Sequence, residues 1–250
     1  MSDKSAIEWT DATWNPTTGC SKVSPGCAHC YAERLSLRFG RSVSSWTPAN
    51  APENIQLHPD RYDLPLRWRE PKRIFVDSMS DLFHELVPEE VVARVWSTMA
   101  AAPHHQFQIL TKRPERMPEI VGRRIEEHGV LPNVWLGTSI ENDRWVGRAD
   151  SLRATPAAVR FISAEPLLGP LPSLNLAEID WLIVGGESGP GHRRIEAEWV
   201  RDLRRRADEL GVAFFFKQWG GSVAKSGGRV LDGRTHDAFP GEDREIAAAS

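Results

Sequence analysis

The chain has few cysteines and tyrosines, and it lacks long apolar segments. Its 250 residues include three Cys and two Tyr. No run of about 18 apolar residues is present, so we expect no transmembrane helix. The first nine residues are polar and lack the apolar core of a secretory signal, which predicts a cytoplasmic protein. An odd number of cysteines without such a signal argues against a disulfide-linked scaffold.

Excess charge of either sign is also absent. The chain carries 31 Lys and Arg against 34 Asp and Glu, a net charge of -3. We therefore do not expect its whole surface to attract nucleic acid, although a local basic patch is compatible with this balance. The arginine-rich run at residues 201–206 is mixed with acidic residues, and we interpret it as the solvated face of a helix.

Short apolar segments recur along the chain. Each has four to six residues and is nearly continuous in apolarity, which is typical of strands buried on both faces. The predicted strands are residues 73–77, 107–111, 134–138, 159–163, 181–185 and 212–217. Between several of them, helical patterns occur at residues 88–102, 113–128, 143–153 and 197–210. Strands that alternate with helices predict parallel strands joined by crossovers.

This alternation predicts an α/β fold, with a complete or partial (β/α) TIM-type barrel as the first choice and a doubly wound open sheet as the alternative. In either fold the active site lies at the C-terminal ends of the strands. Residues 40–68 lack periodicity and contain four prolines, so we expect an irregular connection over the barrel mouth. We expect the barrel domain at residues 1–220. A C-terminal extension is expected at 221–250, which is rich in Gly, Ser and charge.

The three cysteines, Cys20, Cys27 and Cys30, lie within eleven residues with the spacing C-x6-C-x2-C. Glycine and proline residues beside them predict a tight loop in which the three thiolates converge on one point. Thiolates are strong ligands of iron–sulfur clusters and of zinc. The spacing leaves three interpretations open: a cluster, a structural zinc site completed by a histidine, or unliganded thiols.

Three cysteine ligands, rather than four, would matter for the chemistry of a cluster. A cubane cluster held by three cysteines leaves one iron atom open to an external ligand. S-adenosylmethionine binds such an iron through its amino and carboxylate groups. An electron transferred into its sulfonium then releases a 5′-deoxyadenosyl radical, which abstracts hydrogen from an unreactive carbon.

Specific motifs occur throughout the chain. They are WNPTTGC (14–20), CAHCY (27–31), VDSMSDLFH (76–84), LTKRP (110–114), LGTSIEN (136–142), SAEPL (163–167), VGGESG (184–189) and FKQWG (216–220). Together they resemble a family of phage- and bacterium-associated proteins described as three-Cys-motif or radical-SAM-like. The resemblance covers nearly the whole chain. It implies a barrel of the radical SAM kind, with a [4Fe–4S] cluster on Cys20, Cys27 and Cys30 and S-adenosylmethionine as cofactor.

A more distant resemblance is to spore photoproduct lyase, the radical enzyme that splits a UV-induced thymine dimer in DNA. The cysteine loop of that family has an aromatic residue before its last Cys, where this chain has His29, so the resemblance makes His29 a candidate for binding the cofactor. A strand of that family ends in Thr-Lys, whose lysine contacts the cofactor carboxylate, and Thr111-Lys112 is similar. A serine on the next strand also serves the cofactor there, and Ser139 resembles it. The resemblance implies damaged DNA as substrate and a reductant such as flavodoxin or ferredoxin.

The hydrogen donor is a point at which the chain departs from that family. The photoproduct lyases of spore formers use a further cysteine as hydrogen donor, and this chain has no fourth cysteine. Its cysteine loop is also three residues longer than the usual C-x3-C-x2-C loop. If the chain performs the same repair, Tyr31, Tyr62 or another donor would have to return the hydrogen atom.

Polar residues that follow the predicted strands are the remaining candidates for binding the cofactor. Those after the first strand could hold the methionine amino group or the ribose hydroxyls, and those after later strands would ring the barrel mouth. The candidates are Asp77, Ser78, Asp81, Ser139, Glu141, Glu165 and Glu187. Helix capping and tight turns are the structural alternatives for such residues.

Three functions therefore stand beside one another. The first is a radical S-adenosylmethionine enzyme that repairs a thymine photoproduct in DNA. The second is a radical enzyme that modifies another nucleoside or a protein. The third is a zinc-stabilised nucleic-acid-binding module without catalytic activity.

Overall fold

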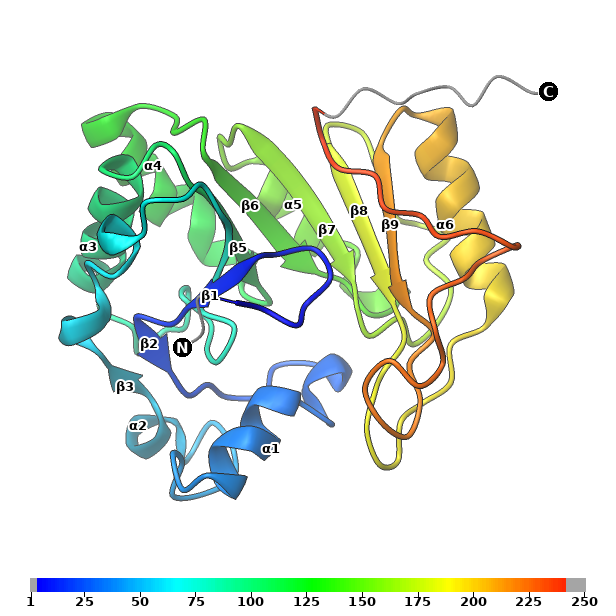
Figure 1. Cartoon of the computed structure of the whole chain (residues 1–250), viewed down its shortest axis with the longest axis horizontal. Coiled ribbons are helices and arrows are strands. Elements are labelled where there is room, and N and C mark those ends of the chain that lie inside the picture. The colour runs from blue at the N-terminus through cyan, green and yellow to red at the C-terminus, as the bar shows by residue number, and fades with distance from the viewer. Residues whose placement is uncertain (1–3, 242–250) are drawn as a thin grey trace.

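A curled, wholly parallel sheet forms the centre of the molecule. The computed structural model describes residues 4–241. Seven strands follow one another in the order β1-β4-β5-β6-β7-β8-β9, and every neighbouring pair is parallel. They are β1 (Ala12–Trp14), β4 (Arg73–Val76), β5 (Gln106–Thr111), β6 (Val134–Ser139), β7 (Val159–Ala164), β8 (Trp181–Gly185) and β9 (Ala213–Gln218). β1 and β9 do not pair with each other, so the sheet is a half-barrel (Figure 1).

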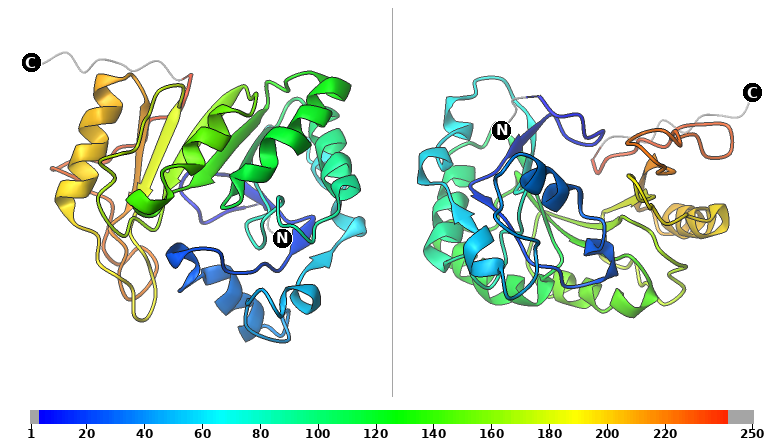
Figure 2. Two further views of the ribbon diagram at one scale, coloured as in Figure 1. Left: turned by 180° about the vertical axis from the view of Figure 1, so that it is seen from behind. Right: turned by 90° about the horizontal axis from the view of Figure 1, so that it is seen from below.

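Helices cover the convex face of this sheet. The described residues form six α-helices: α1 (Tyr31–Arg38), α2 (Ala51–Asn54), α3 (Glu89–Ala100), α4 (Met117–His128), α5 (Arg148–Arg153) and α6 (Ala197–Glu209). The last four lie on the outer side of the strands, whereas α1 lies apart from them (Figure 2). A separate antiparallel pair, β2 (Thr17–Thr18) with β3 (Gln56–Leu57), flanks α2. None of the helices within residues 4–241 is long and apolar enough to cross a membrane.

Alternating side chains along each strand divide the core into two clusters. Ile74 and Val76 of β4 pack in the outer cluster with the helices, while Phe75 between them belongs to an inner cluster. This follows from the two-residue period of a strand. The inner cluster is largely aromatic and centres on Trp181, whose ring lies 5.6 Å from that of Phe161 and 6.0 Å from that of Phe215. The concave floor of the half-barrel is therefore apolar and filled.

Helix α6 shows how the sequence pattern places one face on the sheet. Val200, Leu203 and Ala207 recur at helical spacing and are buried. On the opposite face Arg201 pairs with Glu198, and Arg205 pairs with Asp202 and Glu209. The arginine-rich run is thus a solvated face balanced by carboxylates.

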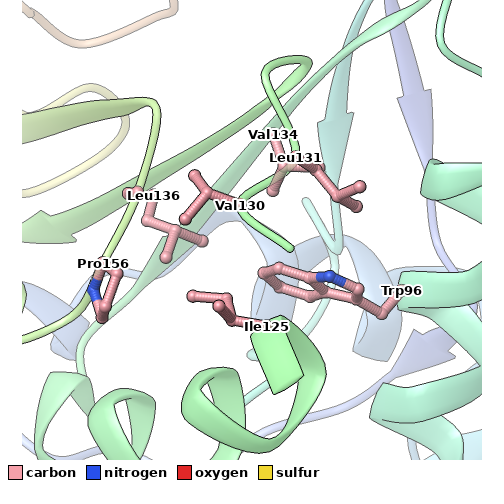
Figure 3. Close-up of a pocket in the computed structure, with 8 residues that line it drawn as sticks. Trp96, Ile125, Val130, Leu131, Val134, Leu136 and Pro156 are labelled. Carbon is pink, nitrogen blue, oxygen red and sulfur yellow. The ribbon is translucent and has the colours of Figure 1, made fainter. Parts of the chain in front are cut away.

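A small apolar cavity lies on the convex side, between Trp96 of α3, Ile125 of α4 and Leu136 of β6 (Figure 3). Its volume is about 10 Å³, which is close to the space that one water molecule needs. Because its lining is apolar, we interpret this space as a packing gap in the outer core.

The partial barrel predicted from the sequence is confirmed, and the doubly wound alternative is wrong, because the strands lie side by side in chain order. The six predicted strands and four predicted helices are present with small shifts of their ends; Pro114 begins a 3-10 turn, so α4 starts only at Met117. Residues 40–68, expected to be irregular, contain α2 and β3.

The beginning of the predicted C-terminal extension packs against the sheet. The backbone N–H of Phe216 donates to the carbonyl of His236 at 2.9 Å, and the Trp181 indole donates to the carbonyl of Ala238 at 2.9 Å. Phe239 stacks on Trp181 with ring centres 4.9 Å apart. Residues 221–241 therefore cover the edge of β9, and residues 242–250 lie outside the described part.

Candidate active site

A cavity of about 560 Å³ opens at the C-terminal ends of the strands, which is the size of an ordinary small-molecule site. The cysteine loop and α1 form one wall, and the strand ends form the other. Ser139 and Ser163 are register partners on neighbouring strands, and both line it. Glu165 and Lys217 line it as well and form an ion pair of 2.6 Å.

All three cysteines line this cavity, and all are half-buried free thiols. Burial, with the nearby Asp81 carboxylate, raises the pKa of Cys20 to about 12, and burial also raises the pKa of Cys30. Within residues 4–241, no three His, Cys, Asp or Glu side chains are grouped closely enough to hold one metal ion. The thiols therefore do not converge on one point, contrary to the expectation from the glycine and proline turns. A cubane cluster binds each cysteine at a different iron atom, so a cluster does not require the three thiols to meet at one point.

Glu141 supports the cysteine loop from behind. Its carboxylate accepts a hydrogen bond of 3.2 Å from the backbone N–H of Gly26 and one of 3.0 Å from Arg148. A Cβ atom at position 26 would lie 3.2 Å from the Glu141 carboxyl carbon and 3.4 Å from Cε of Lys112. Glycine at this position thus lets the loop approach the strand ends. Glu141, predicted from the sequence to bind cofactor, contacts the loop here and is not among the residues that line the cavity.

A latch of three side chains joins the cysteine loop to the segment after β8; we use this name for His29, Glu187 and Arg193. The Glu187 carboxylate lies 2.9 Å from His29 Nδ1 and accepts from the Arg193 backbone N–H at 2.9 Å. Arg193 in turn donates to the carbonyl of Pro25 at 3.0 Å. Burial by itself raises the pKa of Glu187, but hydrogen bonds from Arg193 and His29 prevail and hold it at about 2.

Arg113 is buried directly behind Cys20. Its guanidinium donates to Cys20 Sγ at 3.4 Å, to the Ser21 hydroxyl at 2.8 Å and to Glu85 at 2.9 Å. The Ser21 hydroxyl also contacts His84 Nε2 at 2.8 Å. Burial, with the neighbouring Arg113, lowers the pKa of His84 to about 4, so this histidine is neutral near pH 7. Arg113 therefore brings a fixed positive charge to the first cysteine.

The aspartates after β4 are held by neighbouring protein groups. Asp77 accepts hydrogen bonds from the backbone N–H and the hydroxyl of Thr17, at 3.1 and 3.0 Å. Burial raises its pKa to about 7, against these hydrogen bonds, which lower it. Asp81 accepts from the Thr111 hydroxyl at 2.6 Å and the Lys112 N–H at 3.1 Å. Both line the cavity, but their oxygens already tie β2 and the end of β5 to the segment after β4.

Lys112 and Ser139 lie in the cavity wall, as the sequence predicts for cofactor contacts. The Ser139 hydroxyl is buried and has no hydrogen-bond partner within the described residues. Ser78 donates its hydroxyl to Asn15 at 3.1 Å. Its carbonyl accepts a hydrogen bond of 2.6 Å from the Tyr31 hydroxyl.

The two tyrosines lie in different surroundings. Tyr31 begins α1 directly after Cys30 and lines the cavity. Tyr62 packs against the outer hydrophobic cluster and is not among the residues that line the cavity. The structure thus brings Tyr31, but not Tyr62, to the cysteine loop.

Sequence reasoning missed Arg148 as a partner of Glu141, and it missed the contacts of Arg193 with Glu187 and of Arg113 with Cys20. Arg193 and Glu187 are only six residues apart, and this close spacing of opposite charges is a sequence signal for their ion pair. The contact between Arg113 and Cys20 spans 93 residues, and no local pattern reveals such a pair.

The comparisons with known proteins begin with a family model. The model described as "Protein of unknown function (DUF5131)" matches residues 4–240. The chain belongs to this family. No curated protein matches the sequence significantly.

Solved structures with a similar arrangement are forms of spore photoproduct lyase. A cysteine-to-serine mutant is 14% identical with a TM-score of 0.49, covering 82% of this chain and 75% of that one. A double mutant with bound AdoMet and dinucleoside spore photoproduct is 14% identical with a TM-score of 0.44, covering 79% and 61%. At this distance the similarity concerns the fold.

Proposed function

We propose that this protein is a radical S-adenosylmethionine enzyme whose Cys20, Cys27 and Cys30 hold a [4Fe–4S] cluster. One observation carries the proposal: all three cysteines line the same strand-end cavity as Lys112 and Ser139. A reduced cluster held there would supply one electron to the sulfonium of bound S-adenosylmethionine, whose bond from sulfur to the adenosyl carbon would break with methionine as the leaving group, so that hydrogen abstraction from the substrate could follow. The residues of this chain bind, orient and shield that reaction.

Each side chain has a role that follows from its contacts. Lys112 would meet the cofactor carboxylate, because its side chain lines the cavity and its Cε lies beside Gly26 of the cysteine loop. Ser139 offers a buried hydroxyl without a partner in the described part, so a bound ligand would satisfy it. Tyr31, whose hydroxyl lies in the cavity wall on the Ser78 carbonyl, is our candidate for returning the hydrogen atom.

The substrate we propose is a thymine photoproduct in DNA. The sequence resemblance of Thr111-Lys112 and of the cysteine loop to photoproduct lyases supports it. The chain would remove one hydrogen atom from the methylene bridge of the lesion, let the dimer fragment, and return a hydrogen atom.

Electron paramagnetic resonance on anaerobically reconstituted, reduced protein tests the cofactor assignment. We expect a [4Fe–4S]⁺ signal that changes shape when S-adenosylmethionine is added. Lys112→Ala should keep the cluster signal but weaken the change. The control is Lys72→Ala, which should behave as the wild type. Lys72 precedes β4 at the N-terminal side of the sheet, whereas Lys112 follows β5 at the C-terminal side. Zinc in place of iron, with no signal, would refute the proposal.

The substrate is tested separately with UV-irradiated DNA and its dinucleotide lesion. We expect the lesion to revert to thymine with reduced protein and cofactor, and Tyr31→Phe to slow that return. Cofactor cleavage with an unchanged lesion would reject the DNA-repair substrate and leave the radical mechanism standing.

A further inference from the structure

The outer side of α1 and the residues after it carry an exposed, unbalanced positive charge. Residues 34–41 contain three arginines and no acidic residue, on a chain whose net charge is -3. Arg34, Arg38 and Arg41 are exposed, and none forms an ion pair within residues 4–241. The acidic neighbour Glu33 turns inward, where it pairs with Lys22 at 2.8 Å and accepts from the Trp46 N–H. The local charge is therefore not neutralised by the protein.

An exposed aromatic ring stands among these arginines. Phe39 is 60% exposed, and the guanidinium carbons of Arg38 and Arg41 each lie 5.6 Å from its ring centre. Leu37 and Val43 beside it are exposed as well. We call Arg34, Arg38, Phe39 and Arg41 the arginine–phenylalanine face.

This face leads directly into the cavity. Arg34 lines the cavity, and Tyr31 at the start of the same helix follows the last cysteine. Eight helical residues span about 12 Å, so Phe39 stands about that far from the cysteine loop. Arg34 also packs on Gly189, where a Cβ atom would collide with its guanidinium. The exposed Arg194, on the same segment after β8, adds a further cation without an ion-pair partner among the described residues.

We propose that the arginine–phenylalanine face binds a single strand of nucleic acid and guides it into the cavity. Unpaired arginines match phosphates, and an exposed ring offers a surface on which a base can stack. A protein partner would more often bury such a ring against apolar groups, whereas two guanidiniums on Phe39 favour a polyanion that also stacks. A single strand fits better than a duplex, because the bases of a duplex are already stacked.

The inference extends the proposed function by naming the polymer and the surface that receives it, and it rests on that function in treating the cavity as the active site. Its test needs neither cofactor cleavage nor repair. Fluorescence anisotropy is measured on the full chain with a labelled, undamaged single-stranded oligonucleotide of mixed sequence, at several salt concentrations.

We expect Phe39→Ala and Phe39→Leu to weaken binding by about 5-fold or more, since stacking of one base contributes about 1–3 kcal/mol. The double variant Arg38→Ala/Arg41→Ala should lower the salt dependence, by about 0.7 in the logarithmic slope for each lost phosphate contact. The control double variant Arg201→Ala/Arg205→Ala, on the carboxylate-balanced face of α6, should bind as the wild type. Thermal unfolding confirms that each variant is folded.

Three outcomes would overturn the inference. They are no binding at low salt, duplex bound as tightly as the single strand, or full affinity retained by Phe39→Ala. Failure here, with cofactor cleavage intact, would leave the proposed function in place. Binding that persists in a protein without a cluster would support this surface even if the radical mechanism fails.

Discussion

Single residues set the electrostatics of the cysteine loop, and Arg113 is the clearest case. It is buried, and it donates to Cys20 Sγ while held by Asp81, Glu85 and Ser21. Hydrogen bonds to cysteine sulfur and nearby positive charge favour the reduced state of a cluster. We therefore assign Arg113 a positioning and tuning role at the first cysteine.

We expect Arg113→Gln to lower the reduction potential of the reconstituted cluster. A fall of about 60 mV corresponds to a tenfold change in a one-electron equilibrium, and we expect at least this change. Arg113→Lys keeps the positive charge, so its reduction potential should lie between those of Arg113→Gln and the wild type. The control is Arg116→Gln, because Arg116 donates to backbone carbonyls of Phe83 and His84 rather than to sulfur. An unchanged potential in an EPR redox titration would contradict the tuning role.

Asp77 gives a pH dependence of stability. Burial raises its pKa from 3.8 to about 7, so between these values the folded state binds more protons than the unfolded state. The contribution of Asp77 to the free energy of unfolding is thus fully present below about pH 4 and is lost as the pH rises through about 7. Asp77→Asn should remove that loss, making the variant more stable than the wild type at pH 8 by on the order of a few kcal/mol. Asparagine also suits the positive φ of 57°.

Urea unfolding at pH 4 and pH 8 measures this difference. The exposed Asp208→Asn on α6 is the matched control and should track the wild type at both values. A variant that loses stability at pH 8 would mean that the Thr17 hydrogen bonds to the carboxylate outweigh its burial.

At the scale of elements, the latch joins two segments that lie far apart in the strand order. The cysteine loop comes after β1 and β2, and the other segment follows β8, the last strand but one of the sheet. The pKa of Glu187, held at about 2, keeps its carboxylate charged. The contribution of the charged Glu187 to the free energy of unfolding is present above pH 4.5 and is lost only as the pH falls through about 2. The cysteine loop therefore stays attached to the segment after β8 throughout the neutral range.

Glu187→Gln should loosen this attachment. We expect faster hydrogen exchange of the backbone amides in residues 26–30, because the bonds to His29 and Arg193 weaken. Glu209→Gln, which breaks an exposed pair with Arg205 on α6, should leave those amides unchanged. Equal exchange in both variants would contradict a role of Glu187 in holding the loop.

The elements that the sequence predicted are those with a clear apolar pattern. β4 to β9 are nearly continuous in apolarity, and α6 has an apolar stripe, so burial dictated them. β1 has three residues and α1 eight, too few for periodicity to decide. The same distinction applies to the site residues. The cysteines, Lys112 and Ser139 could be predicted because each belongs to a local sequence motif. Glu165 and Lys217 are 52 residues apart, and only the register of the sheet brings them together.

At the scale of the whole molecule, residues 221–241 decide whether the barrel domain is complete at residue 220. They cover the edge of β9 and place Phe239 on Trp181. A chain that ends at residue 220 should expose this aromatic cluster, unfold at a lower temperature and bind a hydrophobic dye. Each aromatic side chain exposed costs about 1.5–3 kcal/mol.

A chain that ends at residue 241 is the matched control and should unfold as the full chain does. Equal unfolding temperatures for all three lengths would make residues 221–250 an independent extension, as the sequence composition suggested.

The open sheet has a seam between β1 and β9, and across it Glu8 and Lys225 form an ion pair of 3.0 Å. In a closed barrel the strand ladders fix the circumference. Within residues 4–241 no strand ladder joins β1 to β9, so a change in the curvature of the sheet would not require a ladder hydrogen bond between these two strands to break. We therefore expect the seam to be the place where the cavity adapts its width, so that the same strand ends could bind ligands of different size.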